Sequence, residues 1–120
     1  MIGATYQSRA IQAVLGEGHA IVIPDTLYSG WLDGSLDLLA MTGLTVPHAT
    51  FGESGTGVAN IDVVDGGVCP ASVPAFFALF DAAEAGEIVA YAAVTFDSTP
   101  AESDPLSFAA GELEFLYVEA

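Results

Sequence analysis

Apolar and polar residues alternate along several short stretches of the chain, and segments rich in glycine or proline separate these stretches. Such alternation is typical of β-strands, whose side chains point in turn to the two faces of a sheet. Alternation occurs in TLYSGWLDG (26–34), VANIDVV (58–64) and LEFLYV (113–118), whereas AFFALF (75–80) and IVAYAAVTF (88–96) are apolar on both faces and are also predicted to be strands. We therefore predict a mainly β fold, an antiparallel β-sandwich or a barrel-like domain.

The first residues follow a different pattern. In GATYQSRAIQAVLG (3–16) the apolar residues lie near one stripe at helical spacing, and glycines follow it. We predict a short N-terminal helix or arm over residues 1–18 and a β-sandwich domain over residues 19–120. Because the apolar stripe is thin, the helix would pack on the β domain or dock on a neighbouring subunit.

The segments between the predicted strands are less regular. SLDLLAM (35–41) fits either a helical turn or a strand. Residues 43–57 contain Pro47 and four glycines and are predicted to be loop-rich. GGVCPASVP (66–74) is predicted to be a connection, and STPAESDP (98–105) a polar loop.

Three predicted strands carry apolar residues on both faces, which is unusual for an antiparallel sheet with one face in water. In residues 75–80, Phe76, Ala78 and Phe80 would face one way, and Phe77 and Leu79 the other. The second apolar face of the sheet must then be shielded from water by the N-terminal helix, a long loop or another subunit. The acidic segment DAAEAGE that follows would turn in water at the end of the sheet, where its charges discourage unwanted association.

The charge of the chain is strongly one-sided. Sixteen acidic residues and a single base, Arg9, give a formal net charge of −15. Binding to nucleic acid or to an anionic membrane depends on Lys and Arg, so neither is expected as a partner. The carboxylates would be solvated, face a basic partner or hold cations, and we favour solvation.

The length of 120 residues suits one domain with a real core. The single cysteine, Cys69, has no partner for an intrachain disulfide and is predicted to be a buried, inert thiol. The start of the chain lacks the apolar run of a signal peptide, and HAIVIP (19–24) is too short to span a bilayer. We expect a protein that works where it is made or is carried in an assembly.

The motifs that suggest chemistry are all incomplete. FGESGTG (51–57) lacks the last glycine of a nucleophile elbow and has no lysine for a P-loop, and GTGVAN (55–60) has Asn60 in place of the last glycine of G-x-G-x-x-G. His19 and His48 lack partners at zinc-ligand spacing, and His48 is interpreted as a surface histidine.

DGSLD (33–37) matches the first three ligand positions of a calcium loop, but Leu38 and Leu44 occupy the positions of its glycine and glutamate. Weak divalent binding stays open. No spacing favours a pair of catalytic carboxylates. We predict that the chain is not an enzyme and holds no cofactor and no specific metal.

Five segments occur in an order that supports a resemblance. They are DTLYSGWLDG (25–34), ATFGESG (49–55), VANIDVV (58–64), FFALFDAAEAGEIVAYAAVTF (76–96) and SFAAGELEFLYVE (107–119). Together they resemble short virion proteins of tailed bacteriophages, especially of actinobacteria, that are labelled tail fibre, minor tail or head-decoration proteins. The resemblance implies a β-sandwich building block without an active site, which forms symmetric oligomers, often trimers, on a capsid or tail.

We therefore expect a head-decoration protein that is made in the host cytoplasm and binds the major capsid protein on the outer shell of the virion as an oligomer. One alternative is a minor tail or fibre-base protein that binds a tail protein. An alternative of another class is a carbohydrate- or cell-surface-binding module, which an exposed Trp31 or Tyr28 would support. The side chains expected to cover the second face or to contact a partner are Tyr6, Ile11, Trp31, Phe77, Tyr91, Leu116 and Tyr117.

Overall fold

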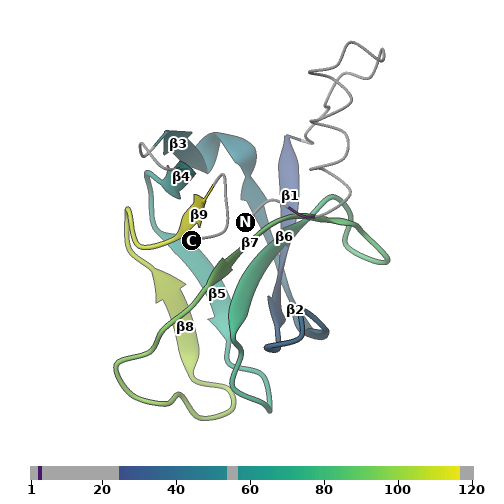
Figure 1. Ribbon diagram of the computed structural model, residues 1–120, viewed down its shortest axis with the longest axis vertical. Helices are drawn as coiled ribbons and strands as arrows, with labels where there is room; N and C mark the ends of the chain where they lie inside the picture. Colours follow the sequence, from purple (N-terminus) through teal and green to yellow (C-terminus); the bar gives the residue numbers. More distant parts are fainter. Residues whose placement is uncertain (1–2, 4–24, 54–56, 117–120) are drawn as a thin grey trace.

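The structure is a computed structural model that describes residues 3, 25–53 and 57–116 (Figure 1). The predicted N-terminal helix or arm, residues 1–18, lies outside the described residues except for Gly3. The elements are β1 (Thr26–Leu32), β2 (Leu38–Pro47), the 3₁₀ helix η1 (His48–Thr50), β3 (Phe51–Glu53), β4 (Gly57–Asn60), β5 (Val64–Val68), β6 (Phe76–Phe80), β7 (Ile88–Ala93), β8 (Pro105–Phe108) and β9 (Glu114–Leu116).

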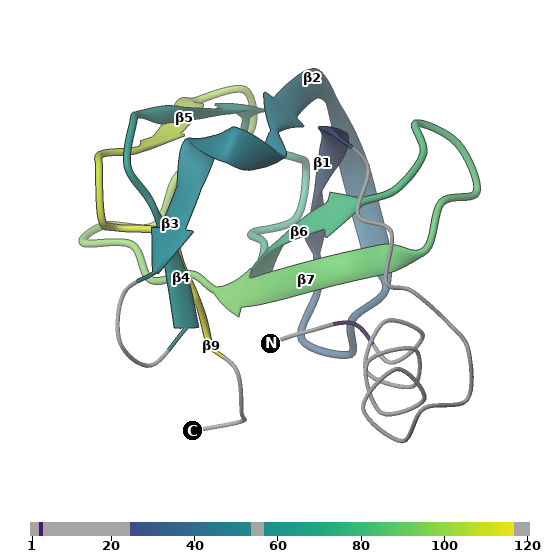
Figure 2. The same ribbon diagram turned by 90° about the horizontal axis from the view of Figure 1, so that it is seen from above.

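These strands form three antiparallel sheets. The four-stranded sheet has the order β2-β1-β6-β7, the three-stranded sheet β3-β4-β9, and the two-stranded sheet β5-β8. Figures 1 and 2 show both smaller sheets on one side of the four-stranded sheet. The described strands do not close into a barrel, so the mainly β prediction is confirmed in its sandwich-like form.

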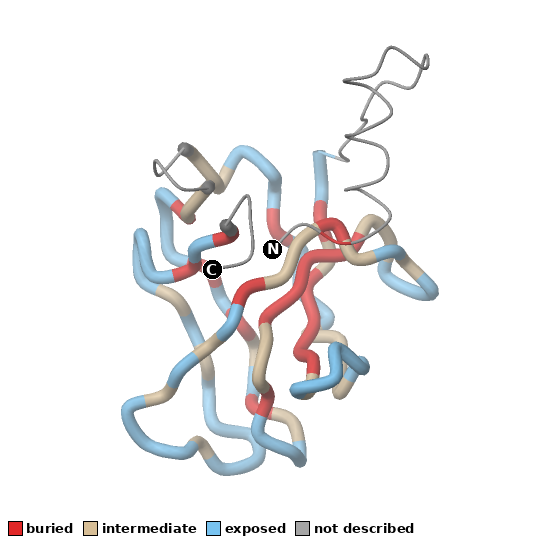
Figure 3. Tube along the Cα trace, in the orientation of Figure 1, coloured by how far each residue is buried: buried red, intermediate tan, exposed pale blue. Residues whose placement is uncertain are grey.

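The core lies between the four-stranded sheet and the smaller sheets. Figure 3 shows buried positions along β1 and β6, the two central strands. The buried members of this core are Leu27, Trp31, Val46, Val64, Phe77, Leu79, Val89, Ala92, Leu113 and Phe115. A second buried group, Leu32, Ala78 and Phe80, lies on the opposite face of the sheet. The prediction that β6 is buried on both faces is therefore confirmed, with Phe77 and Leu79 on one side and Ala78 and Phe80 on the other.

Trp31 joins the four-stranded sheet to the two-stranded sheet. Its ring lies 4.8 Å from that of Phe77 in an edge-on arrangement and 5.9 Å from that of Phe108 on β8. Its indole Nε1–H donates a hydrogen bond to the Gly66 carbonyl on β5 (2.9 Å). A Cβ atom at Gly66 would meet Trp31 Cζ2 at 2.8 Å and the Leu106 carbonyl oxygen at 3.1 Å. Glycine at position 66 thus permits the close approach of the two sheets.

Asn60 connects β4 to the segment between β8 and β9. Its Nδ2 group donates to the carbonyls of Asp62 (2.8 Å) and Ala109 (2.9 Å), with a longer contact to Phe108 (3.4 Å). Its Oδ1 accepts the Leu113 N–H at 2.9 Å. Asn60 is 2% exposed, so these bonds satisfy a buried amide and fix the path of a distant segment.

An enlarged bulge interrupts the pairing of β1 with β2. Tyr28 is opposite Thr45 and Gly30 is opposite Met41, so three residues of β2 correspond to one of β1. The Ser29 and Thr42 hydroxyls lie 2.6 Å apart at this point, and the Leu44 N–H donates to Thr42 Oγ1 (3.0 Å). Gly43 takes a positive φ of 77°, which glycine adopts without steric cost.

The structure corrects several predictions about the middle of the chain. Residues 35–41, left undecided, include the start of β2. The loop predicted over 43–57 is wrong for most of its described part, where the rest of β2, then η1 and β3, occur. Gly43 belongs to the bulge, and Pro47 ends a strand at the edge of its sheet, where a missing N–H is tolerated.

Further corrections concern strand ends. The strand predicted over 58–64 is two strands, because the chain leaves the three-stranded sheet after Asn60 and enters the two-stranded sheet at Val64. The predicted connection over 66–74 begins inside β5. A strand over Pro105–Phe108 was not predicted, because it is short and lies beside a polar loop.

Candidate functional site

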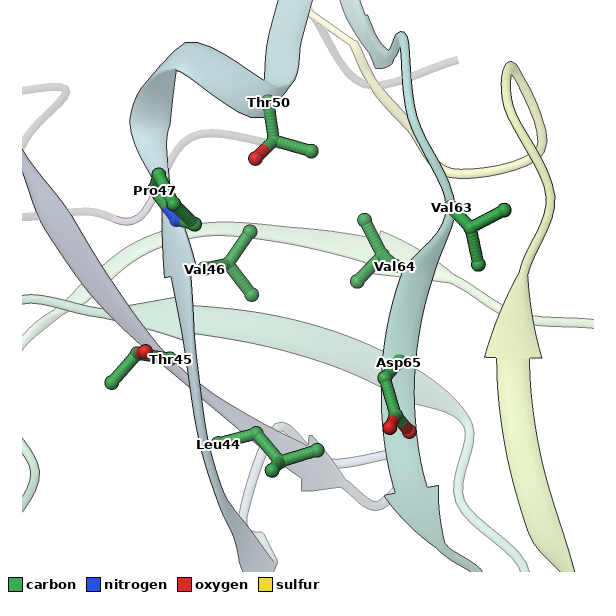
Figure 4. A pocket seen from close by; sticks show the side chains of 8 residues that line it. All are labelled: Leu44, Thr45, Val46, Pro47, Thr50, Val63, Val64 and Asp65. Atoms are coloured by element: carbon green, nitrogen blue, oxygen red, sulfur yellow. The ribbon is translucent and has the colours of Figure 1, made fainter.

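A groove with an apolar floor lies between β2 and β5, and we call it the β2–β5 groove. Its volume is about 320 Å³. The residues that line it are Leu44, Thr45, Val46, Pro47, Thr50, Val63, Val64 and Asp65. Figure 4 shows Val46 and Val64 pointing toward one another between the two strands. The groove is therefore built by segments that lie about 20 residues apart in the sequence.

The groove has a buried apolar floor and an exposed rim. Val46 and Val64 are 5% and 3% exposed and belong to the main core. Leu44 and Val63 are 37% and 68% exposed. Large exposed apolar side chains beside a hollow are typical of surfaces that contact another molecule.

Asp65 is the titratable residue in the lining of the groove. Its Oδ1 accepts the Gly67 N–H at 2.8 Å, so the carboxylate also closes a local turn. The described lining holds no second acidic side chain and no basic one, so this carboxylate suits contact with a cation better than proton transfer.

Carboxylates close turns elsewhere in the described chain as well. Asp81 Oδ1 accepts the Glu87 N–H (2.8 Å) across the acidic turn between β6 and β7. Asp104 Oδ2 accepts from the Ala101 N–H and Glu112 Oε1 from the Ala109 N–H, both at 2.8 Å. The acidic turns are thus more than a solvated surface, because their side chains replace backbone hydrogen-bond partners.

The fragment that resembles a calcium loop is also organised by hydrogen bonds. Asp33 Oδ1 accepts the N–H groups of Ser35 (2.8 Å) and Asp37 (3.0 Å). The oxygen that would be the first calcium ligand is therefore engaged by backbone donors. Within residues 3, 25–53 and 57–116, no group of three His, Cys, Asp or Glu side chains is arranged to hold a metal ion.

The predicted contact residues have different positions. Trp31 and Phe77 are 1% and 0% exposed, so this prediction is corrected for both: they fill the core of the chain itself. Their aromatic character did not distinguish a core role from a contact role, because both roles favour large apolar rings. Buried Trp31 also cannot act as a platform for a sugar.

Tyr91 is half-buried on the second face of the four-stranded sheet, where its ring packs edge-on against Phe76 at 5.6 Å. Tyr28 is half-buried on the same face. Leu116 ends β9, but its side chain is not among those described. Tyr6, Ile11 and Tyr117 lie outside the described residues. Among the predicted residues whose side chains are described, none lines the β2–β5 groove.

Two remaining candidates, Cys69 and His48, lie outside the lining of the β2–β5 groove. Cys69 is 2% exposed, and its burial raises the pKa of the thiol, to which the nearby Asp104 and Glu102 carboxylates add. This confirms the predicted buried thiol. His48 is exposed, as predicted, and its Nδ1 lies 3.6 Å from Asp25 Oδ1. His19 lies outside the described residues, as does most of the glycine-rich turn between β3 and β4.

Gly3 lies against β7. Its N–H donates to the Val89 carbonyl at 2.9 Å, and a side chain at this position would collide with the Ile88 backbone.

The described part of the chain contains no helix with the length and apolarity needed to cross a membrane.

We compared the chain with protein-family models, with curated proteins and with solved structures, and nothing in any of the three comparisons matches it.

Proposed function

We propose that this chain is a non-enzymatic structural protein of a tailed-bacteriophage virion, and that it decorates the head by binding the major capsid protein on the outer shell as an oligomer. The observation that carries the proposal is the combination of an apolar β2–β5 groove with a strongly negative net charge of −15. The order of its sequence segments, which resembles that of virion proteins, gives the proposal its particular form.

The charge supports a position on the outside of a particle. A net charge of −15 repels packaged nucleic acid and keeps neighbouring particles apart. The carboxylates of Asp33, Asp81, Asp104 and Glu112 are held in exposed turns, so much of this charge is presented to solvent.

The exposed apolar side chains support a contact with another protein. Leu44 and Val63 lie on the rim of one groove and are not shielded by the chain. Tyr28, Phe76 and Tyr91 form a second, half-buried apolar group on the outer face of the four-stranded sheet. Two separate apolar surfaces suit a protein that contacts both a shell and its own copies, and a trimer is the first oligomer to test.

The proposal is tested by counting copies in purified particles of the phage whose genome encodes the chain. Quantitative mass spectrometry against the major capsid protein gives the number, and cryo-electron microscopy gives the position. Hundreds of copies on the outer shell are expected. A handful of copies at the tail would support the minor tail or fibre-base alternative, and absence from the particle would contradict a virion role.

A further inference from the structure

The two strands that border the β2–β5 groove are both outer strands of their sheets. β2 ends the order β2-β1-β6-β7, and β5 has only β8 as a hydrogen-bonded neighbour. Within the described residues, no strand ladder joins β2 to β5 across the groove. An outer strand offers unpaired backbone groups to any extended segment that can reach it.

The register shows which backbone groups of β2 point toward the groove. The His48 N–H donates to the Asp25 carbonyl at 2.9 Å, which makes this pair a hydrogen-bonded one. Hydrogen-bonded and non-hydrogen-bonded pairs alternate in an antiparallel ladder, so the pairs Thr26–Pro47 and Tyr28–Thr45 are of the second type. The N–H and C=O of Thr45 and the C=O of Pro47 therefore point away from β1, toward the side where β5 lies.

The side chains of the groove select an apolar occupant. Val46 and Val64 form a floor continuous with the core, and Leu44 and Val63 stand exposed beside it. An extended segment lying on β2 would place every second side chain over this floor. Burial of these side chains and of the exposed rim would supply the favourable free energy of association.

The charges select a basic occupant. Asp65 lies in the groove, Asp62 precedes the rim residue Val63, and the chain as a whole carries −15. Like charges disfavour a second copy of this chain in the groove, whereas a segment with Lys or Arg is attracted to it.

We propose that the β2–β5 groove docks an extended segment of another protein in which apolar residues alternate with Lys or Arg, and that this segment pairs as an added strand with β2 at Thr45–Pro47. Its apolar side chains cover Val46 and Val64, and one of its bases faces Asp65. Pairing of this kind takes its affinity from the backbone and its specificity from alternate side chains. The inference rests on the groove alone and does not depend on a role in a virion.

The first test is a titration of the full-length, ¹⁵N-labelled chain followed by nuclear magnetic resonance. The titrants are capped synthetic peptides with the sequences KVTVKVTVK, QVTVQVTVQ and EVTVEVTVE, and a copy of the first that is N-methylated at alternate residues. The basic peptide should shift the amide resonances of residues 44–46 and 63–65 and bind at least about tenfold more tightly than the acidic one. The N-methylated copy, which cannot complete the added ladder, should lose most of this binding.

Variants of the chain locate the contact. Asp65→Asn keeps the oxygen that caps Gly67 but removes the charge, and it should weaken the basic peptide by about two- to fivefold. Leu44→Gln should weaken all peptides, whereas Leu38→Gln, at an exposed leucine near the other end of β2, should not.

Three results would overturn the proposal. One is the absence of shifts at residues 44–46 and 63–65 with every peptide at millimolar concentration. Another is equal binding of the basic and acidic peptides, which would remove the argument from charge. The third is broadening of the groove resonances with protein concentration alone, which would identify the occupant as a second copy of the chain.

Discussion

Replacing Asn60 by alanine should destabilise the fold more than the loss of any exposed polar side chain. The substitution removes the donor of the hydrogen bonds to the Asp62 and Ala109 carbonyls and the acceptor of the Leu113 N–H. Two of these partners lie about 50 residues further along the chain, so the change weakens the attachment of the segment before β9 to β4 and leaves only the backbone bonds of residue 60 to Gly111 and Leu113.

The magnitude follows from these three short bonds. Each contributes a net ~0.5–1.5 kcal/mol, and a buried donor left without a partner, such as the Leu113 N–H, costs ~1–3 kcal/mol. Asn60→Ala should therefore lower the free energy of unfolding by about 2–5 kcal/mol, a large part of the ~5–15 kcal/mol of a typical domain. With an unfolding entropy of about 0.25 kcal/mol/K for a chain of this length, Tm should fall by about 8–20 °C.

The assay is urea unfolding followed by the fluorescence of Trp31, which is the single tryptophan and lies in the core. Asn60→Asp is the informative companion, because it keeps the shape and the acceptor but turns an oxygen toward the carbonyls of Asp62 and Ala109. Burial beside these carbonyls raises the pKa of the new carboxyl, so Asn60→Asp should regain stability as the pH falls below about 5. A loss below about 0.5 kcal/mol for Asn60→Ala would refute the assigned role.

The remaining predictions concern close packing, the thiol and divalent cations. Gly66→Ala should lower the free energy of unfolding by about 1–3 kcal/mol, because the new Cβ would press on Trp31 at 2.8 Å. Gly34→Ala, whose Cβ would meet nothing within 4 Å, should be neutral or slightly stabilising. Thermal melts of both variants measure the difference, and equal effects would contradict this prediction. Burial raises the pKa of the Cys69 thiol in the folded chain. The stability that the neutral thiol contributes is therefore fully present below the thiol pKa of the unfolded chain, about 8.5. This stability is lost as the pH rises through the higher pKa of the folded chain. The difference in Tm between the parent and Cys69→Ala should therefore change between pH 7 and 10 and stay flat between pH 6 and 7. Millimolar calcium should leave the mass by light scattering and the Tm unchanged, since Asp33 Oδ1 is engaged by two N–H groups; a clear rise in either would restore the segment as a cation site.

The sequence alone could predict those strands whose formation depends on residues that are close together in the chain. β1 follows from its alternating side chains, and β6 and β7 follow from short apolar runs between turn residues. The burial of β6 on both faces follows from the same unbroken run of apolar side chains. β2 was missed because Gly43 and Pro47 are typical loop residues, and only the register with β1 shows that they fit a bulge and a strand end.

The candidate site could not be predicted because its parts meet only through long-range contacts. The Trp31 hydrogen bond to Gly66 holds β5 against the four-stranded sheet, and the groove forms where β5 passes β2. Asn60 was interpreted as an incomplete phosphate-binding motif, since nothing in the local sequence indicates partners at Ala109 and Leu113. A weak indication of the groove in the sequence was Val63, an exposed apolar residue that directly follows the acidic Asp62.

The most direct test of the proposed function is binding of the purified chain to shells assembled from the major capsid protein that is encoded in the same genome, as the proposal requires. Sedimentation measures the amount of chain bound as its concentration rises, with Leu38→Gln as a control for folding and Leu44→Gln as a change in the groove. The account predicts saturation at a fixed ratio of chain to capsid subunit. A chain that stays in the supernatant at every concentration while remaining folded would contradict it.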